Sequence, residues 1–241
     1  MVLLRFGCAL IVAAVTCASH CVQAEVVRIE ISSRTDVLGG KPFGAAGAYE
    51  KIVGKVFFSV DPAHPRNKAV IDLDKAPRDA DGRVTFSADL YVLAPKDGGN
   101  GVAFFDVLNR GRKNMLRDFN RAAAVPDPTA EGDFGDGFLM RQGFTLVWVG
   151  WQFDIPHRGG LMGLDAPPVL DQGKPVTGRV STTFTPNTAE ETYALDDMGR
   201  YADTTRYPPL DPLSAANTLT VRMAFSARRA LLRATSGSSA A

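Results

Sequence analysis

The sequence predicts an α/β fold, and two short apolar runs with a helical segment between them support this prediction. The first run spans residues 102–108 and is apolar except for Asp106, and the second spans residues 144–153. Near-continuous apolar runs bounded by turn signals are typical of strands covered on both faces, as in parallel sheets. The segment between them is long enough for a crossover and has helical spacing over residues 112–124. We therefore predict a βαβ unit over residues 101–156, with functional groups at its strand ends.

The region before this unit, residues 25–100, is predicted to be an antiparallel β region. Strand-like runs with β-branched and aromatic side chains recur at residues 26–31, 49–60, 70–73 and 84–93. Turn-forming Gly, Pro and Asp residues separate these runs. This spacing favours a meander of short antiparallel hairpins.

Residues 1–24 have the pattern of a secretory signal peptide that is cut after Ala24. The segment has one basic residue (Arg5), an apolar run over residues 6–15 and a final V-Q-A. The apolar run is shorter than the ~20 residues that span a membrane. The three cysteines all lie in this segment, at Cys8, Cys17 and Cys21. The mature chain is therefore expected to be periplasmic or secreted, with no disulfide and no thiolate nucleophile.

The charge balance argues against nucleic-acid and membrane partners. Removal of Arg5 from the 27 basic residues leaves 26, against 26 acidic residues. A nucleic-acid or anionic-membrane partner requires a basic excess, so neither is expected after signal cleavage. The oligomeric state does not follow from the sequence.

Metal and cofactor motifs are also missing from the sequence. The mature chain has two histidines, His64 and His157, and it contains no H-E-x-x-H, no P-loop and no full G-x-G-x-x-G. The D-A-D-G at residues 79–82 lacks the glutamate of a calcium loop and is better explained as a hairpin turn. We predict no metal site and no cofactor.

Two sets of residues and one histidine are candidates for a functional site. The first set ends the first apolar run and consists of Asn109, Arg110 and Gly111. Its backbone N–H groups can face a developing oxyanion, or the trio can simply form a strand-to-helix turn. The second set ends the second run and consists of Trp148, Trp151, Gln152 and Asp154. These side chains can line a pocket or, for the aromatic ones, fill the core. His157, on a loop, is either a site residue or simply solvated.

Long stretches of the chain resemble the N-terminal part of a family of exported bacterial alpha/beta hydrolase domain proteins. The matching stretches are residues 44–67, 71–95, 104–111, 135–156 and 207–210. The resemblance implies an incomplete α/β-hydrolase-like sheet preceded by the N-terminal β region. It also implies serine-type hydrolysis of an ester or related acyl bond in a small-molecule, ester-like substrate. Asn109, Arg110 and Gly111 would then form the oxyanion turn.

The resemblance implies that the catalytic serine, acid and histidine lie beyond the equivalent of residue 222. Residues 157–222 would be a loop-rich insertion, whereas residues 223–241 do not resemble the family and are expected to form a disordered tail. The chain contains no G-x-S-x-G, and none of its serines has a recognisable catalytic context. A truncated hydrolase that is inactive alone is therefore expected. The alternative is a secreted β-rich binding module that stacks aromatic side chains on a flat ligand.

Overall fold

The computed structural model describes residues 24–155, 159–181, 183, 210–211, 213–223 and 226–232. The predicted signal peptide lies outside these residues except for Ala24, and His157 also lies outside them.

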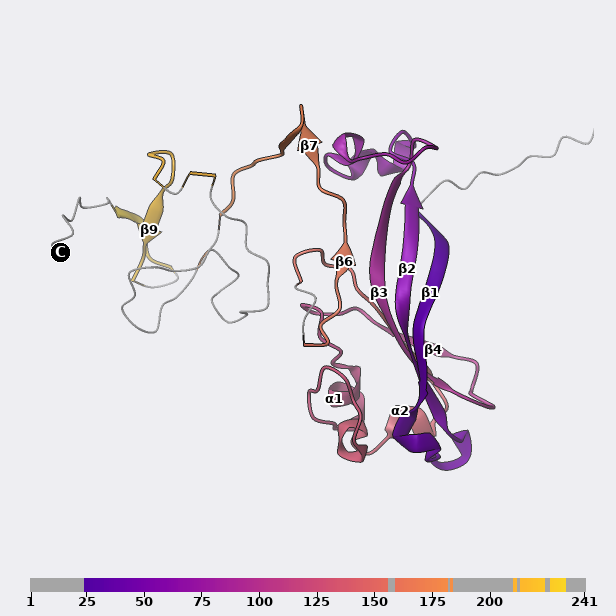
Figure 1. Cartoon of the computed structure of the whole chain (residues 1–241). Coiled ribbons are helices and arrows are strands. Elements are labelled where there is room, and N and C mark those ends of the chain that lie inside the picture. The colour runs from indigo at the N-terminus through magenta and orange to yellow at the C-terminus, as the bar shows by residue number, and fades with distance from the viewer. Residues whose placement is uncertain are drawn as a thin grey trace, which may run out of the picture.

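A six-stranded sheet is the largest element of the described fold (Figure 1). Its main path is β1-β2-β3-β5-β4, and β6 pairs with β3. The strands are β1 (Glu25–Asp36), β2 (Tyr49–Val60), β3 (Val84–Pro95), β4 (Ala103–Asp106), β5 (Thr145–Val149) and β6 (Leu164–Asp165). All neighbouring strands in this sheet pair antiparallel except β4 and β5, which are parallel.

The predicted α/β fold class, with an incomplete α/β-hydrolase-like sheet, is therefore wrong. The sheet is mixed and mostly antiparallel, and the two described α-helices are short. The parallel pair exists, but it is limited to four residues on each strand. The expectation failed because the first apolar run is not covered on both faces: the side chains of Phe105 and Val107 are 54% and 68% exposed. A short apolar run looks the same in sequence whether one face or both are buried.

The antiparallel N-terminal region is present, but its strands are longer than predicted. β1, β2 and β3 each have 12 residues and form one continuous meander. The strand predicted at residues 70–73 is wrong, because 3₁₀ turns occupy this part of the chain: η3 (Pro65–Ala69) and η4 (Leu73–Lys75). Pro65 at the start of η3 fixes a helical φ, which favours the turn over a strand.

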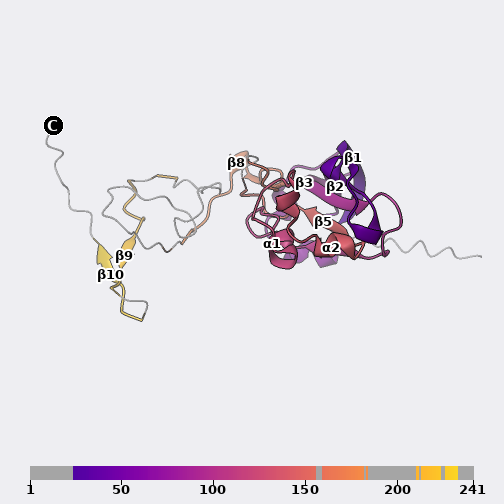
Figure 2. The same cartoon turned by 90° about the horizontal axis from the view of Figure 1, so that it is seen from below.

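The helical elements are short and interrupted. The two α-helices are α1 (Met115–Asn120) and α2 (Phe138–Arg141), and three further 3₁₀ turns are η1 (Val37–Gly40), η2 (Gly44–Ala46) and η5 (Glu131–Phe134). Arg121 ends α1 in the left-handed region (φ 57°), well before the predicted end of that helix. Seen from below, α1 and α2 lie at one end of the sheet near β5 (Figure 2). In the described residues, no helix is long and apolar enough to cross a membrane.

Two smaller strand pairs follow the main sheet along the chain. β7 (Leu170–Asp171) pairs with β8 (Lys174–Pro175), and β9 (Leu219–Val221) pairs with β10 (Ala230–Leu232). β10 belongs to the tail that the sequence predicts to be disordered, so part of this tail forms a strand.

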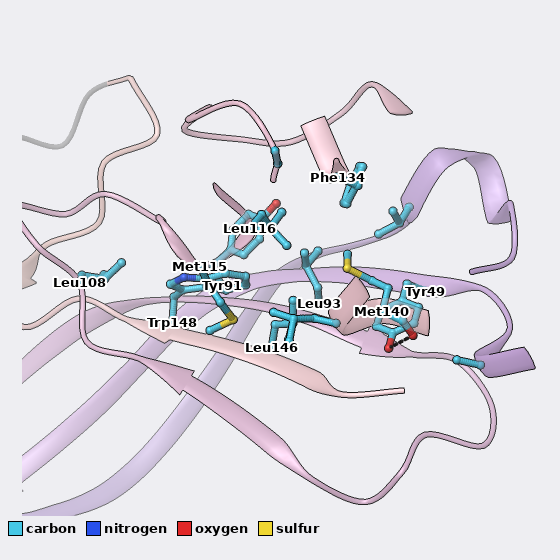
Figure 3. Close-up of a cluster of buried hydrophobic side chains, with 14 of the residues drawn as sticks. Tyr49, Tyr91, Leu93, Leu108, Met115, Leu116, Phe134, Met140, Leu146 and Trp148 are labelled. Carbon is cyan, nitrogen blue, oxygen red and sulfur yellow. Dashed lines mark hydrogen bonds between the residues drawn. The ribbon is translucent and has the colours of Figure 1, made fainter. Parts of the chain in front are cut away.

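One face of the sheet carries the hydrophobic core (Figure 3). Register places Leu93 opposite Leu146 and Tyr91 opposite Trp148, so these four side chains share a face. Residues from both α-helices and from η5 pack onto them, among them Met115, Leu116, Phe134 and Met140. The core therefore depends on the segment between β4 and β5, which folds back over the sheet.

The opposite face carries a second apolar row that is not part of this core. Register aligns Ile52, Val92, Val147 and Phe105 across β2, β3, β5 and β4. None of these four residues belongs to the buried cluster. The row ends at Phe105 on the outermost strand, where the ring is half exposed. Apolar side chains therefore extend across the sheet to its β4 edge.

Candidate functional site

The structure brings the two predicted sets of site residues together. The backbone N–H of Arg110 donates a hydrogen bond to Oε1 of Gln152 at 2.8 Å. The Arg110 guanidinium also forms a partly buried ion pair with Asp154, with both side chains less than one-fifth exposed. Trp151 donates its indole N–H to the carbonyl oxygen of Leu108. Side-chain hydrogen bonds and an ion pair thus connect the carboxyl ends of the parallel strands β4 and β5. We call the residues that make these contacts the strand-end network: Leu108, Arg110, Trp151, Gln152 and Asp154.

Gly111 occupies a position that only glycine tolerates. Its φ is +73°, and an added Cβ would lie 2.8 Å from both Ile155 Cγ2 and the Met162 carbonyl oxygen. The Met162 N–H donates to the Gly111 carbonyl at 3.0 Å, so this close approach is part of the fold. The glycine is therefore explained by conformation and packing, independently of any catalytic role.

The predicted oxyanion turn retains fewer backbone donors than expected. Gln152 accepts the Arg110 N–H, and the Arg112 N–H donates to the Asn109 carbonyl at 3.2 Å. Within the described part of the chain, the Gly111 N–H has no hydrogen-bond partner. The Asn109 side chain is exposed. Of the amides at Arg110, Gly111 and Arg112, that of Gly111 is thus the one without a hydrogen-bond acceptor in the described residues, and Gly111 itself is buried.

The aromatic members of the second set separate into two environments. Trp148 is 1% exposed, its ring meets that of Tyr91 edge-on at 5.6 Å, and its indole N–H donates to Asp106 at 2.9 Å. Trp151 is 54% exposed, although its indole N–H is bonded to the backbone. Trp148 is thus a core residue, whereas Trp151 presents its ring to solvent.

Sequence reasoning missed a buried amine, Lys113. Its side chain is 9% exposed, its Nζ donates to the Gly160 carbonyl at 2.9 Å, and the ammonium lies 4.6 Å from the centroid of the Tyr91 ring. Burial lowers the pKa of Lys113 to about 8, although the carboxylates of Asp127 and Asp89 act in the opposite direction. No sequence signal distinguishes this lysine, because it lies in a polar turn whose burial depends on distant residues.

The depressed pKa of Lys113 predicts a pH dependence of stability. Lys113 keeps its proton up to about pH 10.5 in the unfolded chain but only up to about pH 8 in the folded chain. The free-energy cost of burying the charge is therefore full below pH 8 and disappears as the pH rises to about 10.5. The difference amounts to about 3 kcal/mol. Urea unfolding at pH 7 and pH 10 should therefore show that Lys113→Met raises the free energy of unfolding more at pH 7. An equal effect at both pH values would contradict the depressed pKa.

No described serine has a histidine partner. Ser59 Oγ accepts from the Arg83 guanidinium, and His64 Nδ1 accepts from the Arg66 backbone N–H at 3.2 Å. Ser87 Oγ donates to Asp165 at 3.2 Å, and the same carboxylate pairs with Lys55. This contact raises the pKa of Lys55, so the lysine is charged and cannot act as a base toward Ser87.

The described residues also contain no group of three or more His, Cys, Asp or Glu side chains arranged to hold a metal ion. Comparison with protein-family models, with curated proteins and with solved structures gives no match.

Proposed function

We propose that this chain forms the N-terminal portion of an exported serine-type hydrolase that cleaves an ester or related acyl bond in a small molecule. The strand-end network is the observation that carries the proposal. It joins the Arg110 backbone to Gln152 and the Arg110 side chain to Asp154, at the carboxyl ends of two parallel strands. In α/β sheets the carboxyl ends of parallel strands bind substrates, and β4 and β5 are the one parallel pair of this mostly antiparallel sheet. The hydrolase class comes from the sequence resemblance, and export comes from the predicted signal peptide.

The β4 edge of the sheet supports the view that further polypeptide completes the site. Among the described residues, β4 pairs with β5 alone. The opposite edge strand, β1, carries Arg28 and Glu30, and charges of this kind protect an edge from other chains. β4 has no basic residue and exposes Phe105. Its apolar side chains and unpaired edge are suited to contact with a segment that carries the nucleophile.

The proposal predicts that the purified chain shows no acyl-enzyme burst with p-nitrophenyl acetate. The reason is that a serine requires a base within hydrogen-bond reach, and Ser59 and Ser87 are bonded to arginine and aspartate instead. Stopped-flow absorbance of released p-nitrophenolate measures the burst, with Ser87→Ala as the matched variant. A burst of about one equivalent that disappears in one Ser→Ala variant would overturn the prediction.

A second experiment tests the positive part of the proposal. The DNA downstream of this coding sequence should contain, in one of its three frames, a G-x-S-x-G followed by an aspartate and a histidine. Coexpression of that segment with this chain should produce esterase activity that neither polypeptide has alone. A downstream sequence without these motifs in any frame would contradict the proposal.

A secreted binding module is the second candidate, and the exposed aromatic rings favour it. Trp151 and Phe153 are each 54% exposed and lie two residues apart in one loop. Rings of this kind stack on sugars and other flat ligands. Retention of the chain on an insoluble polysaccharide, lost in Trp151→Ala and kept in the control Phe138→Ala, would favour this function over the hydrolase. Phe138 is a suitable control because it is also a partly exposed ring (43%) but lies on α2.

A further inference from the structure

β1 is a long edge strand that is exposed along its whole length (Figure 1). Among the described residues it pairs with β2 alone, so its other side is open to a further strand. All 12 of its residues are exposed, and four of them are large and apolar: Val26, Val27, Ile29 and Ile31. A long, exposed, apolar edge of this kind is a surface on which another strand can pair.

Arg28 and Glu30 differ from the other charged residues of β1 in what they contact. In the described residues these two side chains form an ion pair with each other, and the Arg28 guanidinium lies 3.8 Å from the centroid of the Phe57 ring. Both side chains are more than half exposed. The charged residues nearer the ends of the strand form ion pairs with residues outside β1: Glu25 with Arg83, Arg34 with Glu50 and Asp36 with Lys96.

The middle of β1 is its most regular part. Pairing with β2 is continuous over residues 28–31, and register shifts interrupt it on either side. Alternation places Arg28 and Glu30 on one face of this stretch, and Ile29 and Ile31 on the other. Irregularities of this kind hinder pairing at an edge, so the regular stretch is the part of β1 that is best suited to a partner.

We propose that β1 pairs antiparallel with β1 of a second copy of this chain, with Ile29 at the two-fold axis. Symmetric pairing of two identical antiparallel strands places one residue opposite its own copy and brings its two neighbours opposite each other. With Ile29 at the axis, Arg28 of each copy lies opposite Glu30 of the other, which gives two ion pairs on one face. On the other face, Ile29 contacts its own copy.

The charges select both the register and the partner. An axis at Arg28 would place two arginines opposite each other and an axis at Glu30 would place two glutamates, and like charges directly opposite destabilise a sheet. A strand without complementary charges would leave Arg28 and Glu30 facing unsuitable side chains, so these charges exclude unrelated chains. A second copy supplies the complementary charges, which favours it over a partner of unrelated sequence.

This pairing is compatible with either proposed function. β1 and β4 are the opposite ends of the main strand path, so a dimer through β1 leaves the β4 edge free. The contact involves one strand from each copy and is smaller than a standard protein interface, so the dimer is expected to be weak and to depend on concentration.

Sedimentation equilibrium of the purified chain tests the proposal at concentrations from about 1 to 100 μM, the range that suits a weak complex. The average mass should rise toward twice the monomer mass as the concentration increases. Glu30→Arg places like charges opposite each other at both ion pairs, and so does Arg28→Glu. Each single variant should therefore raise the dissociation constant at least ~10-fold.

Mixing the two single variants separates pairing between copies from an effect on the fold. Glu30→Arg has two arginines at these positions and Arg28→Glu has two glutamates, so the mixture should form a heterodimer about as tight as the wild-type dimer. The double variant Arg28→Glu/Glu30→Arg should also dimerise like the wild type. A wild-type chain that stays monomeric over the whole range, single variants that dimerise as the wild type does, or a mixture without a heterodimer would overturn the proposal.

Discussion

Replacement of Gly150 by alanine is expected to lower the free energy of unfolding by about 3–5 kcal/mol. Gly150 follows β5, and its N–H donates to the Asp89 carbonyl at 2.9 Å. An added Cβ would lie 2.0 Å from the Gly163 carbonyl oxygen and 2.6 Å from its carbonyl carbon. Both are backbone atoms, so they cannot move aside as a flexible side chain can. The carbonyl of Gly163 also accepts the Asp89 N–H at 3.1 Å, and the methyl group would disrupt that bond.

Urea unfolding followed by circular dichroism measures this effect, and Gly132→Ala is the matched control. An added Cβ at Gly132 meets nothing within 4 Å, and neither glycine has a positive φ. Both substitutions therefore change the backbone entropy in the same way, but only Gly150→Ala introduces a steric clash. Equal stability of the two variants would show that the Gly163 backbone does not lie against Gly150 as described.

The second large effect is expected at Trp148. Trp148→Ala should cost about 3–5 kcal/mol, because a fully buried indole is replaced by a cavity. The same change removes the edge-on contact with Tyr91 and leaves Asp106 without its indole donor. Thermal or urea unfolding should show the loss as a lower midpoint.

Trp151→Ala is the natural comparison for Trp148→Ala. The Trp151 ring is half exposed and makes one hydrogen bond, to the Leu108 carbonyl, so its loss should cost about 1 kcal/mol. Similar losses of unfolding free energy in the two variants would contradict the assignment of Trp148 to the core and of Trp151 to the surface.

Much of the local structure follows from short-range patterns. The alternation at residues 26–31 and the strand-like run at residues 84–93 predict strands that are present in β1 and β3. The two apolar runs pair in parallel, as their separation predicts. The α/β class was nevertheless wrong, since these local patterns do not reveal that β5 joins β3 antiparallel and that β4 remains at an edge.

The contact between the two strand ends was predictable from the sequence, but the side-chain bonds that make it were not. The turn-forming N-R-G and the polar residues after the second run indicate the two strand ends, and the structure joins them through Arg110, Gln152 and Asp154. Gln152 accepts the Arg110 N–H, so this amide is not free to bind an oxyanion. The sequence does not encode this contact locally, because it depends on where the Gln152 side chain lies in the folded chain. Whether the site acts on an acyl bond remains a proposal.

The sequence by itself determined where strands and turns form, because alternation and turn chemistry act over a few residues. The tertiary structure alone decided which faces are covered, and therefore which residues are core and which are available. Phe105 and Trp148 are both apolar strand residues, yet one is half exposed and the other is buried. Lys113 is the clearest case: its amine is buried by Tyr91 and Gly160, which lie 22 residues before it and 47 residues after it. Burial depends on such distant contacts, and the chemistry of the side chain depends on its burial.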